Sequence, residues 1–204
     1  MYKDAIIKQY ALTKVQIKLI DIYLNKLEET NQSFNLIGTS TLTNPWDRHI
    51  NDSLQLSKFI FNKKSSIVDL GTGAGLPGLI LYIYGYKNIL LTDSKLKKIK
   101  FIQEFADENK IKIKTMCSRV ENIKNQKFDF VICRAFAPLS KTLDYSLVFS
   151  KKNTSFLFLK GRNVTNEIKD ANKNFKFHYK IFPSKSIGDG FVLKINKLVR
   201  LWVK

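Results

Sequence analysis

The sequence has few of the side chains that build covalent or metal-bound frameworks. It contains two cysteines and two histidines in 204 residues. Cys117 and Cys133 do not have the short spacing of metal-ligand pairs, and a lone pair of cysteines is weak support for a disulfide. We therefore expect two reduced thiols and no bound metal.

Long apolar runs are also missing. No segment approaches the roughly 20 apolar residues that a membrane-spanning helix needs. The N-terminus lacks the charged region and apolar stretch of a signal peptide. We expect a cytoplasmic protein that does not enter a membrane.

Acidic residues are scarce, since 17 Asp and Glu face 35 Lys and Arg, and the net charge is +18. Such a charge attracts polyanions and favours a nucleic acid as partner. The lysine-rich composition of an AT-rich genome would explain the charge equally well. Arginine is rare, so Arg48, Arg119 and Arg134 are positions where a bidentate donor is of interest.

The N-terminal part of the chain has a helical pattern. Apolar residues recur at helical spacing over residues 12–30, and Thr13 with Gln16 resembles a capping box. A second helix is predicted from Asn44 and Pro45 to about Ile60. We expect one compact chain that acts as a monomer, with a helical appendage over residues 1–62 packed on a domain over residues 63–204.

From residue 65 short β-type runs alternate with helical ones, which is typical of an α/β fold with a parallel sheet. The predicted parallel strands are Ser66–Leu70, Asn88–Thr92, Ile111–Thr115, Phe128–Cys133 and Thr154–Lys160.

Four helices are predicted between and after these strands, and an antiparallel hairpin closes the sheet. The result is a Rossmann-like, mostly parallel, seven-stranded sheet. The helices are Leu76–Tyr84, Ser94–Asn109, Pro138–Phe149 and Val164–Asn172, and the hairpin strands are Phe175–Phe182 and Phe191–Val203 with a turn at Ile187–Gly190.

The most informative segment is the glycine-rich run from Ile67 to Gly78, IVDLGTGAGLPG. It leads from a buried strand into a helix, and its glycines let the backbone approach a ligand while the helix N-terminus offers free N–H groups. A nucleotide-like ligand fits such a loop.

The loop also matches the dinucleotide fingerprint, so by itself it does not separate NAD from S-adenosylmethionine. Asp69 favours the second, because a carboxylate repels a pyrophosphate and attracts the ammonium group of methionine. Asp93 ends the second strand, where a carboxylate can accept both ribose hydroxyls of either cofactor. Glu121 is a candidate adenine contact, although a solvated side chain paired with Arg119 is an equally good interpretation.

Further motifs lie on both sides of the glycine loop, in a fixed order. They are Asn35-Leu36-Ile37, the run from Trp46 to Leu54 (WDRHINDSL), Asp93-Ser94, Lys97-Lys98, Arg119-Val120-Glu121, Arg134-Ala135 and Lys160-Gly161. Together they resemble the bacterial 16S ribosomal RNA guanine-N7 methyltransferases, formerly named glucose-inhibited division protein B. The resemblance covers most of the chain.

The resemblance implies a class I S-adenosylmethionine-dependent methyltransferase fold and methyl transfer to N7 of a guanine in 16S rRNA, on free RNA or on the assembling small subunit. It also implies cofactor contacts by Gly71, Leu76, Val120, Glu121 and Arg134. We add Gly73 from the glycine loop and Asp93 on its chemistry.

Guanine N7 carries a lone pair and no proton, so the reaction needs positioning rather than a general base. Arg134 is the candidate beside the reacting groups, and Phe136 is either a stacking partner for the base or a core residue. Cys133 is expected to be a small buried filler. The candidate RNA contacts are Arg48, His49, Lys97 and Lys98, of which His49 is equally well explained as a packed helix residue.

Three other functions are alternatives to methylation of ribosomal RNA. An NAD-linked oxidoreductase would need a catalytic acid or base near the nicotinamide, and only His49 and His178 are available as histidines. A non-enzymatic RNA-binding protein would have no use for an intact glycine loop. A methyltransferase for proteins or small molecules does not account for the basic charge.

Overall fold

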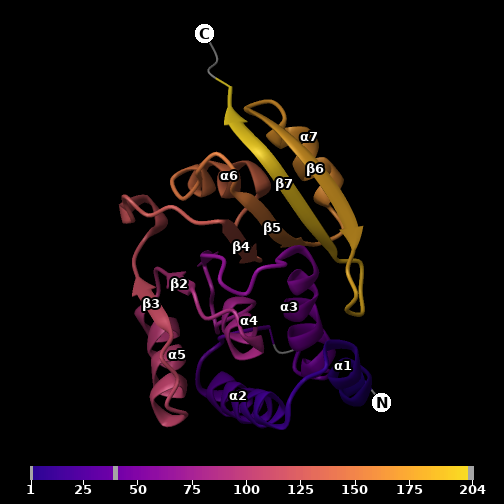
Figure 1. The fold of residues 1–204 in the computed structure, drawn as a ribbon, viewed down its shortest axis with the longest axis vertical. Helices are drawn as coiled ribbons and strands as arrows, with labels where there is room; N and C mark the ends of the chain where they lie inside the picture. Colours follow the sequence, from indigo (N-terminus) through magenta and orange to yellow (C-terminus); the bar gives the residue numbers. More distant parts are fainter. Residues whose placement is uncertain (1, 39–40, 202–204) are drawn as a thin grey trace.

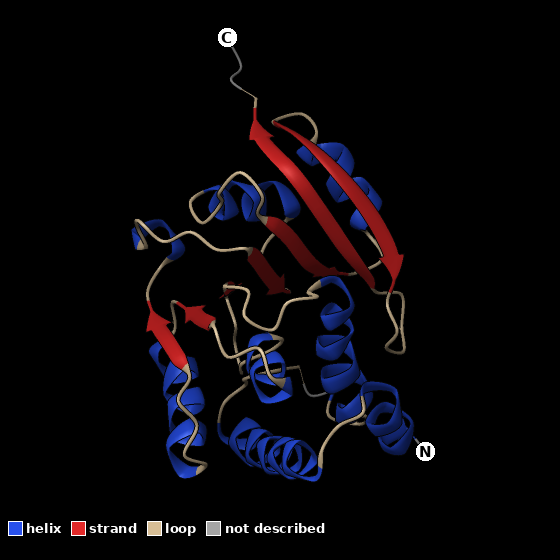
Figure 2. Ribbon diagram, viewed as in Figure 1, coloured by secondary structure: helices blue, strands red, loops and turns tan. Residues whose placement is uncertain are grey.

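The computed structural model describes residues 2–38 and 41–201. A seven-stranded sheet forms its centre in the order β3-β2-β1-β4-β5-β7-β6, with strands β1 to β5 parallel and β7 antiparallel to both neighbours (Figures 1 and 2). The strands are β1 (Ile67–Leu70), β2 (Ile89–Asp93), β3 (Lys114–Cys117), β4 (Phe130–Arg134), β5 (Ser155–Lys160), β6 (Phe175–Pro183) and β7 (Phe191–Arg200). The predicted mostly parallel sheet and closing hairpin are confirmed.

Helices cover both faces of the sheet, which explains why β1 and β2 consist of buried residues throughout. α4 (Gly78–Tyr84) and α5 (Leu96–Glu108) contribute to one hydrophobic cluster, and α6 (Leu139–Leu147) and α7 (Val164–Ala171) to the other. None of the described helices is long and apolar enough to cross a membrane.

The N-terminal segment forms two helices where one was predicted. α1 (Tyr2–Tyr10) precedes α2 (Lys14–Ser33). The predicted capping box is present, because Gln16 N–H donates to Thr13 Oγ1 at 3.3 Å and Thr13 N–H donates to Gln16 Oε1 at 2.9 Å. The pattern missed α1 because that helix buries only Ile6 and Tyr10.

The second predicted helix is three short helical pieces. A π-helix, η2 (Trp46–Asn51), is followed by α3 (Asp52–Leu54) and a 3-10 helix, η3 (Gln55–Phe59). The Asp52 N–H donates to the Asp47 carbonyl five residues back, while the Ser53 hydroxyl donates to the His49 carbonyl at 2.6 Å. A side chain that competes for a backbone carbonyl in this way disturbs the regular ladder.

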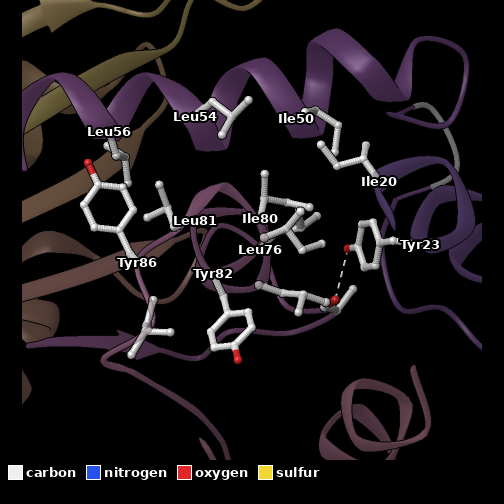
Figure 3. Packing of buried hydrophobic residues seen from close by; sticks show 14 of the residues in the cluster. Ile20, Tyr23, Ile50, Leu54, Leu56, Leu76, Ile80, Leu81, Tyr82 and Tyr86 are labelled. Atoms are coloured by element: carbon white, nitrogen blue, oxygen red, sulfur yellow. Dashed lines mark hydrogen bonds between the residues drawn. The ribbon is translucent and has the colours of Figure 1, made fainter. Parts of the chain in front are cut away.

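These N-terminal pieces share one continuous core with the sheet (Figure 3). Ile20 and Ile50 lie beside Ile80 of α4, and the Tyr23 hydroxyl donates to the Ala74 carbonyl in the glycine-rich turn at 3.0 Å. The boundary at residue 62 stays a prediction.

Several strand boundaries lie one or two residues from the predicted positions, and the start of β3 and the end of β7 differ by three residues. β3 starts at Lys114 rather than Ile111, because Ile111 and Ile113 pack against the core from the loop before the strand. β7 ends at Arg200. The remaining part of the predicted strand, up to Val203, includes two residues outside the described ones.

Candidate functional site

The glycine-rich turn after β1 takes backbone conformations that other residues avoid. Gly71 and Gly73 have φ values of +64° and +60°. A Cβ atom on Gly71 would also overlap the ring of Phe136, which comes from the loop after β4. The turn after β1 and the loop after β4 are therefore in direct contact, as expected where parallel strands end side by side.

Asp69 holds this turn from inside. Its side chain is fully buried, and Oδ2 accepts from Thr72 Oγ1 at 2.6 Å and from the Gly78 N–H at 2.9 Å. Burial raises the Asp69 pKa to about 7. The predicted attraction between Asp69 and a methionine ammonium is not supported, because the carboxylate faces the protein interior.

Asp93 links the turn to the end of β2. Its side chain is 7% exposed. Oδ2 accepts from the Gly73 N–H at 3.0 Å and Oδ1 from the Lys95 N–H at 2.9 Å, while Lys98 Nζ lies 3.9 Å from Oδ2. Two backbone donors thus orient a carboxylate at the carboxyl edge of the sheet.

A cavity of about 300 Å³ opens beside Asp93, and we name it the small cavity. Four of the predicted cofactor residues line it, together with Lys98, Phe136 and Tyr145. The four are Gly71, Asp93, Val120 and Glu121. The Tyr145 hydroxyl donates to Glu121 Oε1 at 2.7 Å, and this hydrogen bond is the main reason that the Glu121 pKa is lowered.

The other predicted cofactor residues do not line the small cavity. Leu76 is buried in the core beneath the turn, and the Gly73 N–H is already bound to Asp93. Arg134 lines a second space of about 880 Å³, which we name the large cavity. Ala135 and Phe136 line both cavities, so the two spaces meet at the loop after β4.

Arg134 lines the large cavity, and one of its guanidinium nitrogens has no hydrogen-bond partner among the described residues. Its Nε lies 3.4 Å from Asp52 Oδ2, whereas Nη1 is buried and has no hydrogen-bond partner among the described residues. Burial raises the Asp52 pKa, and the positive charge of Arg134 opposes that rise. The Arg134 side chain as a whole is 20% exposed, so it borders the cavity while Nη1 itself is covered by protein. An unpaired buried N–H of this kind marks a position that a bound group can satisfy.

His49 does not reach the surface. Its side chain is 1% exposed, and neither ring nitrogen has a hydrogen-bond partner among the described residues. Burial, followed by the charge of Arg134, lowers the His49 pKa to about 3, so the ring is neutral near pH 7. The predicted RNA contact is wrong for this residue in the conformation described, and the packed alternative fits.

The other candidate RNA contacts are dispersed. Arg48 lines the large cavity, where its Nη1 donates to the Ile187 carbonyl at 2.9 Å. Lys98 faces the small cavity beside Asp93, and Lys97 is exposed on α5. Only Arg48 of these three borders the space next to Arg134.

The loop between β6 and β7 forms one wall of the large cavity. The sequence predicted a turn there but no functional role. Three side chains of the helical segment hold it: the Ile187 N–H donates to Asp47 Oδ2 at 2.6 Å, Asn51 Nδ2 donates to the Lys185 carbonyl at 2.9 Å, and the Lys185 N–H donates to Gln55 Oε1 at 2.9 Å. The four-residue spacing of Asp47, Asn51 and Gln55 was the available signal, since it places them on one helix face.

The opposite wall holds a second unexpected group. Lys160 Nζ lies 2.7 Å from Glu167 Oε2, which also accepts the Leu139 N–H at 2.7 Å. Cys133 lies close by and is 2% exposed, and burial raises its thiol pKa far above the usual range. The thiol is therefore un-ionised, which agrees with a filler role.

The sequence model of one family, GidB, described as rRNA small subunit methyltransferase G, matches residues 16–187. The chain belongs to this family. It is 39% identical over 174 residues to the ribosomal RNA small subunit methyltransferase G of Orientia tsutsugamushi (strain Ikeda), covering 85% of this chain and 87% of that one.

Solved structures show the same fold at lower sequence identity. The ribosomal protein L11 methylase of Lactobacillus delbrueckii subsp. bulgaricus is 19% identical, with a TM-score of 0.59 over 71% of this chain and 75% of that one. M. jannaschii TYW2 in complex with AdoMet is 16% identical, with a TM-score of 0.54 over 74% and 77%. The fold of this GidB family member is thus the class I methyltransferase fold. Within its residues 2–38 and 41–201, no group of three or more potential metal ligands occurs.

Proposed function

We propose that this GidB family member transfers the methyl group of S-adenosylmethionine to N7 of a guanine in 16S ribosomal RNA. The observation that carries the proposal is the pair of cavities that meet at Ala135 and Phe136. One has the Asp93 carboxylate and the glycine-rich turn, and the other is larger, open and lined by Arg48, Arg134 and Lys160. A methyl donor and a nucleotide acceptor need two adjoining sites of this kind.

The small cavity fits the nucleoside part of S-adenosylmethionine. Two backbone N–H groups orient the Asp93 carboxylate so that it can accept hydrogen bonds from ribose hydroxyls. Gly71 has no Cβ atom, which leaves room between the turn and the Phe136 ring. Val120 and Glu121 lie where the adenine would bind. Arg134 lines the adjoining cavity and has an unpaired N–H at Nη1 among the described residues, so its guanidinium is the candidate donor to a polar group of the cofactor or of the base. The cofactor supplies an electrophilic methyl group on a sulfonium.

The residues of this chain do the positioning. Because guanine N7 has an in-plane lone pair and no proton, no side chain has to act as a general base. Alignment of donor and acceptor can contribute roughly 7–11 kcal/mol to lowering the barrier. Phe136 borders both cavities and can stack on a splayed guanine, while Arg48 and Arg134 offer donors to its O6 or to a phosphate.

The direct test is methylation of RNA by the purified protein. With S-adenosylmethionine, 16S rRNA or small-subunit particles from cells that lack the gene should acquire one N7-methylguanine, detected by chemical cleavage and primer extension. RNA from cells that contain the gene should accept no further methyl group. Methylation of another base atom, or none with either substrate, would refute the proposal.

Asp93→Asn should weaken S-adenosylhomocysteine binding by about 1–3 kcal/mol in calorimetry, because the variant loses a charged acceptor for the ribose. Asp107→Asn, an exposed change on the neighbouring helix α5, is the matched control and should leave affinity unchanged. NAD should bind neither protein. Equal affinities for the two variants, or binding of NAD by the unmodified protein, would contradict the cofactor assignment.

A further inference from the structure

The hairpin of β6 and β7 has one covered and one open face. Phe175 and Phe177 of β6 are buried in the cluster that α6 and α7 complete, and α7 lies behind the hairpin in Figure 1. The alternate residues Lys176, His178 and Lys180 point to the other side and are exposed.

The opposite strand adds to this open face. Lys194 pairs directly with Lys180 across the two strands, and Asn196 pairs with His178. Near the loop end this face is covered by aromatic rings: those of Phe59 and Phe182 are 4.9 Å apart, and Lys194 Nζ lies 5.9 Å from the centre of the Phe59 ring. We name the set Lys58, Lys176, His178, Lys180, Lys185 and Lys194 the basic hairpin face.

Like charges are held close together on this face at two places. Lys180 lies directly opposite Lys194, an arrangement that destabilises a sheet. Lys58 and Lys185 are close enough for their side chains to interact directly, which lowers the Lys58 pKa. In residues 2–38 and 41–201, no lysine of the basic hairpin face forms an ion pair with an acidic side chain.

The basic hairpin face is continuous with the large cavity. Lys185 belongs to the loop after β6, and residues 186–190 of the same loop line the cavity. The hydrogen bonds from Asp47, Asn51 and Gln55 fix that loop against the helical segment. A polyanion lying along the hairpin would therefore lead directly to the cavity wall.

We propose that the basic hairpin face binds backbone phosphates of the RNA whose target guanine is placed in the large cavity. This inference rests on the proposed function, and it assigns RNA capture to a surface that does not touch the reacting groups. Bound phosphates would reduce the repulsion within both lysine pairs. Relief of this repulsion, which destabilises the free protein, would add to the free energy of RNA binding.

The test is the double variant Lys180→Gln/Lys194→Gln, with Lys14→Gln/Lys18→Gln as matched control. Lys14 and Lys18 are exposed on α2, at the opposite end of the molecule in Figure 1, and their replacement removes the same charge. Binding of 16S rRNA transcript is measured from about 50 to 200 mM salt. The hairpin variant should bind at least about tenfold more weakly at low salt, and the slope of log affinity against log salt should shrink by about 1.4–1.8.

Two further measurements separate RNA capture from a structural role. The melting temperature of the hairpin variant should stay the same or rise, because a like-charge pair is removed, and its S-adenosylhomocysteine affinity should be unchanged. An equal loss of RNA affinity in both double variants would assign capture to net charge alone and overturn the inference. So would an unchanged salt slope in the hairpin variant. If the unmodified protein methylates RNA in either case, the proposed function stands.

Discussion

Replacement of Arg134 by lysine is expected to lower kcat/KM for methyl transfer by roughly 100- to 1,000-fold, the usual effect of removing one preorganised donor beside the reacting groups. Lysine keeps a positive charge near Asp52 but cannot present the planar set of N–H groups of the Arg134 guanidinium, whose Nη1 has no partner among the described residues. Methyl transfer to small-subunit particles, measured at saturating and limiting substrate, gives the loss.

Lysine is preferred to alanine for this test because the Asp52 side chain is only 14% exposed. Arg134→Ala would leave that carboxylate without its ion-pair partner, which costs about 3–5 kcal/mol and could unfold the chain. Arg200→Lys is the matched control, since Arg200 pairs with Asp144 at 2.6 Å outside both cavities. Full activity in a folded Arg134→Lys protein would remove Arg134 from the mechanism.

A large pH effect on stability is expected from Asp69. Its pKa of about 7 in the folded state, against 3.8 as the ordinary value, means that the folded protein binds more protons than the unfolded chain between these pH values. The contribution of Asp69 to stability is therefore largest below pH 4 and falls by about 4 kcal/mol as the pH rises to 7. Asp69→Asn should remove this decline, because an amide keeps an acceptor for Thr72 and Gly78 without a charge.

Asp129→Asn is a useful control with the opposite sign. The hydrogen bond from Lys151 and those from Ser66 lower the Asp129 pKa to about 2, so its contribution is present above pH 4 and is lost as the pH falls toward 2. Urea unfolding of both variants and the unmodified protein between about pH 2 and 8 measures the difference, because the Asp129 effect falls below pH 4 and the Asp69 effect above it. A decline in Asp69→Asn as steep as that of the unmodified protein would show that the Asp69 carboxyl is not the cause.

Much of the fold could be predicted because its signals are local. β1 and β2 are short, mostly apolar runs, the first followed by Gly71 and the second ending at Asp93, and strands buried on both faces have this pattern. The capping box at Thr13 depends on residues three positions apart. Asp93 could be placed beside Gly73 because parallel strands end at the same edge of the sheet.

The points that the sequence left open depend on contacts between distant segments. For His49 the sequence allowed an RNA contact or a packed helix residue, and the structure buries the side chain in η2. The cofactor contact of Leu76 stays a prediction, since the structure shows only that its side chain packs beneath the turn. Asp69 is buried, and its Oδ2 accepts hydrogen bonds from Thr72 and Gly78.

The sequence alone determined the sheet, the glycine-rich turn and the resemblance that led to the family. It also predicted that Asp93 binds the ribose. Each of these depends on neighbouring residues or on the order of strands. Only the tertiary structure brought the loop of residues 184–190 onto Asp47 and Asn51, placed Lys180 opposite Lys194, and joined two cavities at Phe136. Such contacts join positions more than a hundred residues apart or depend on strand register, and no local pattern encodes which side chains will meet there.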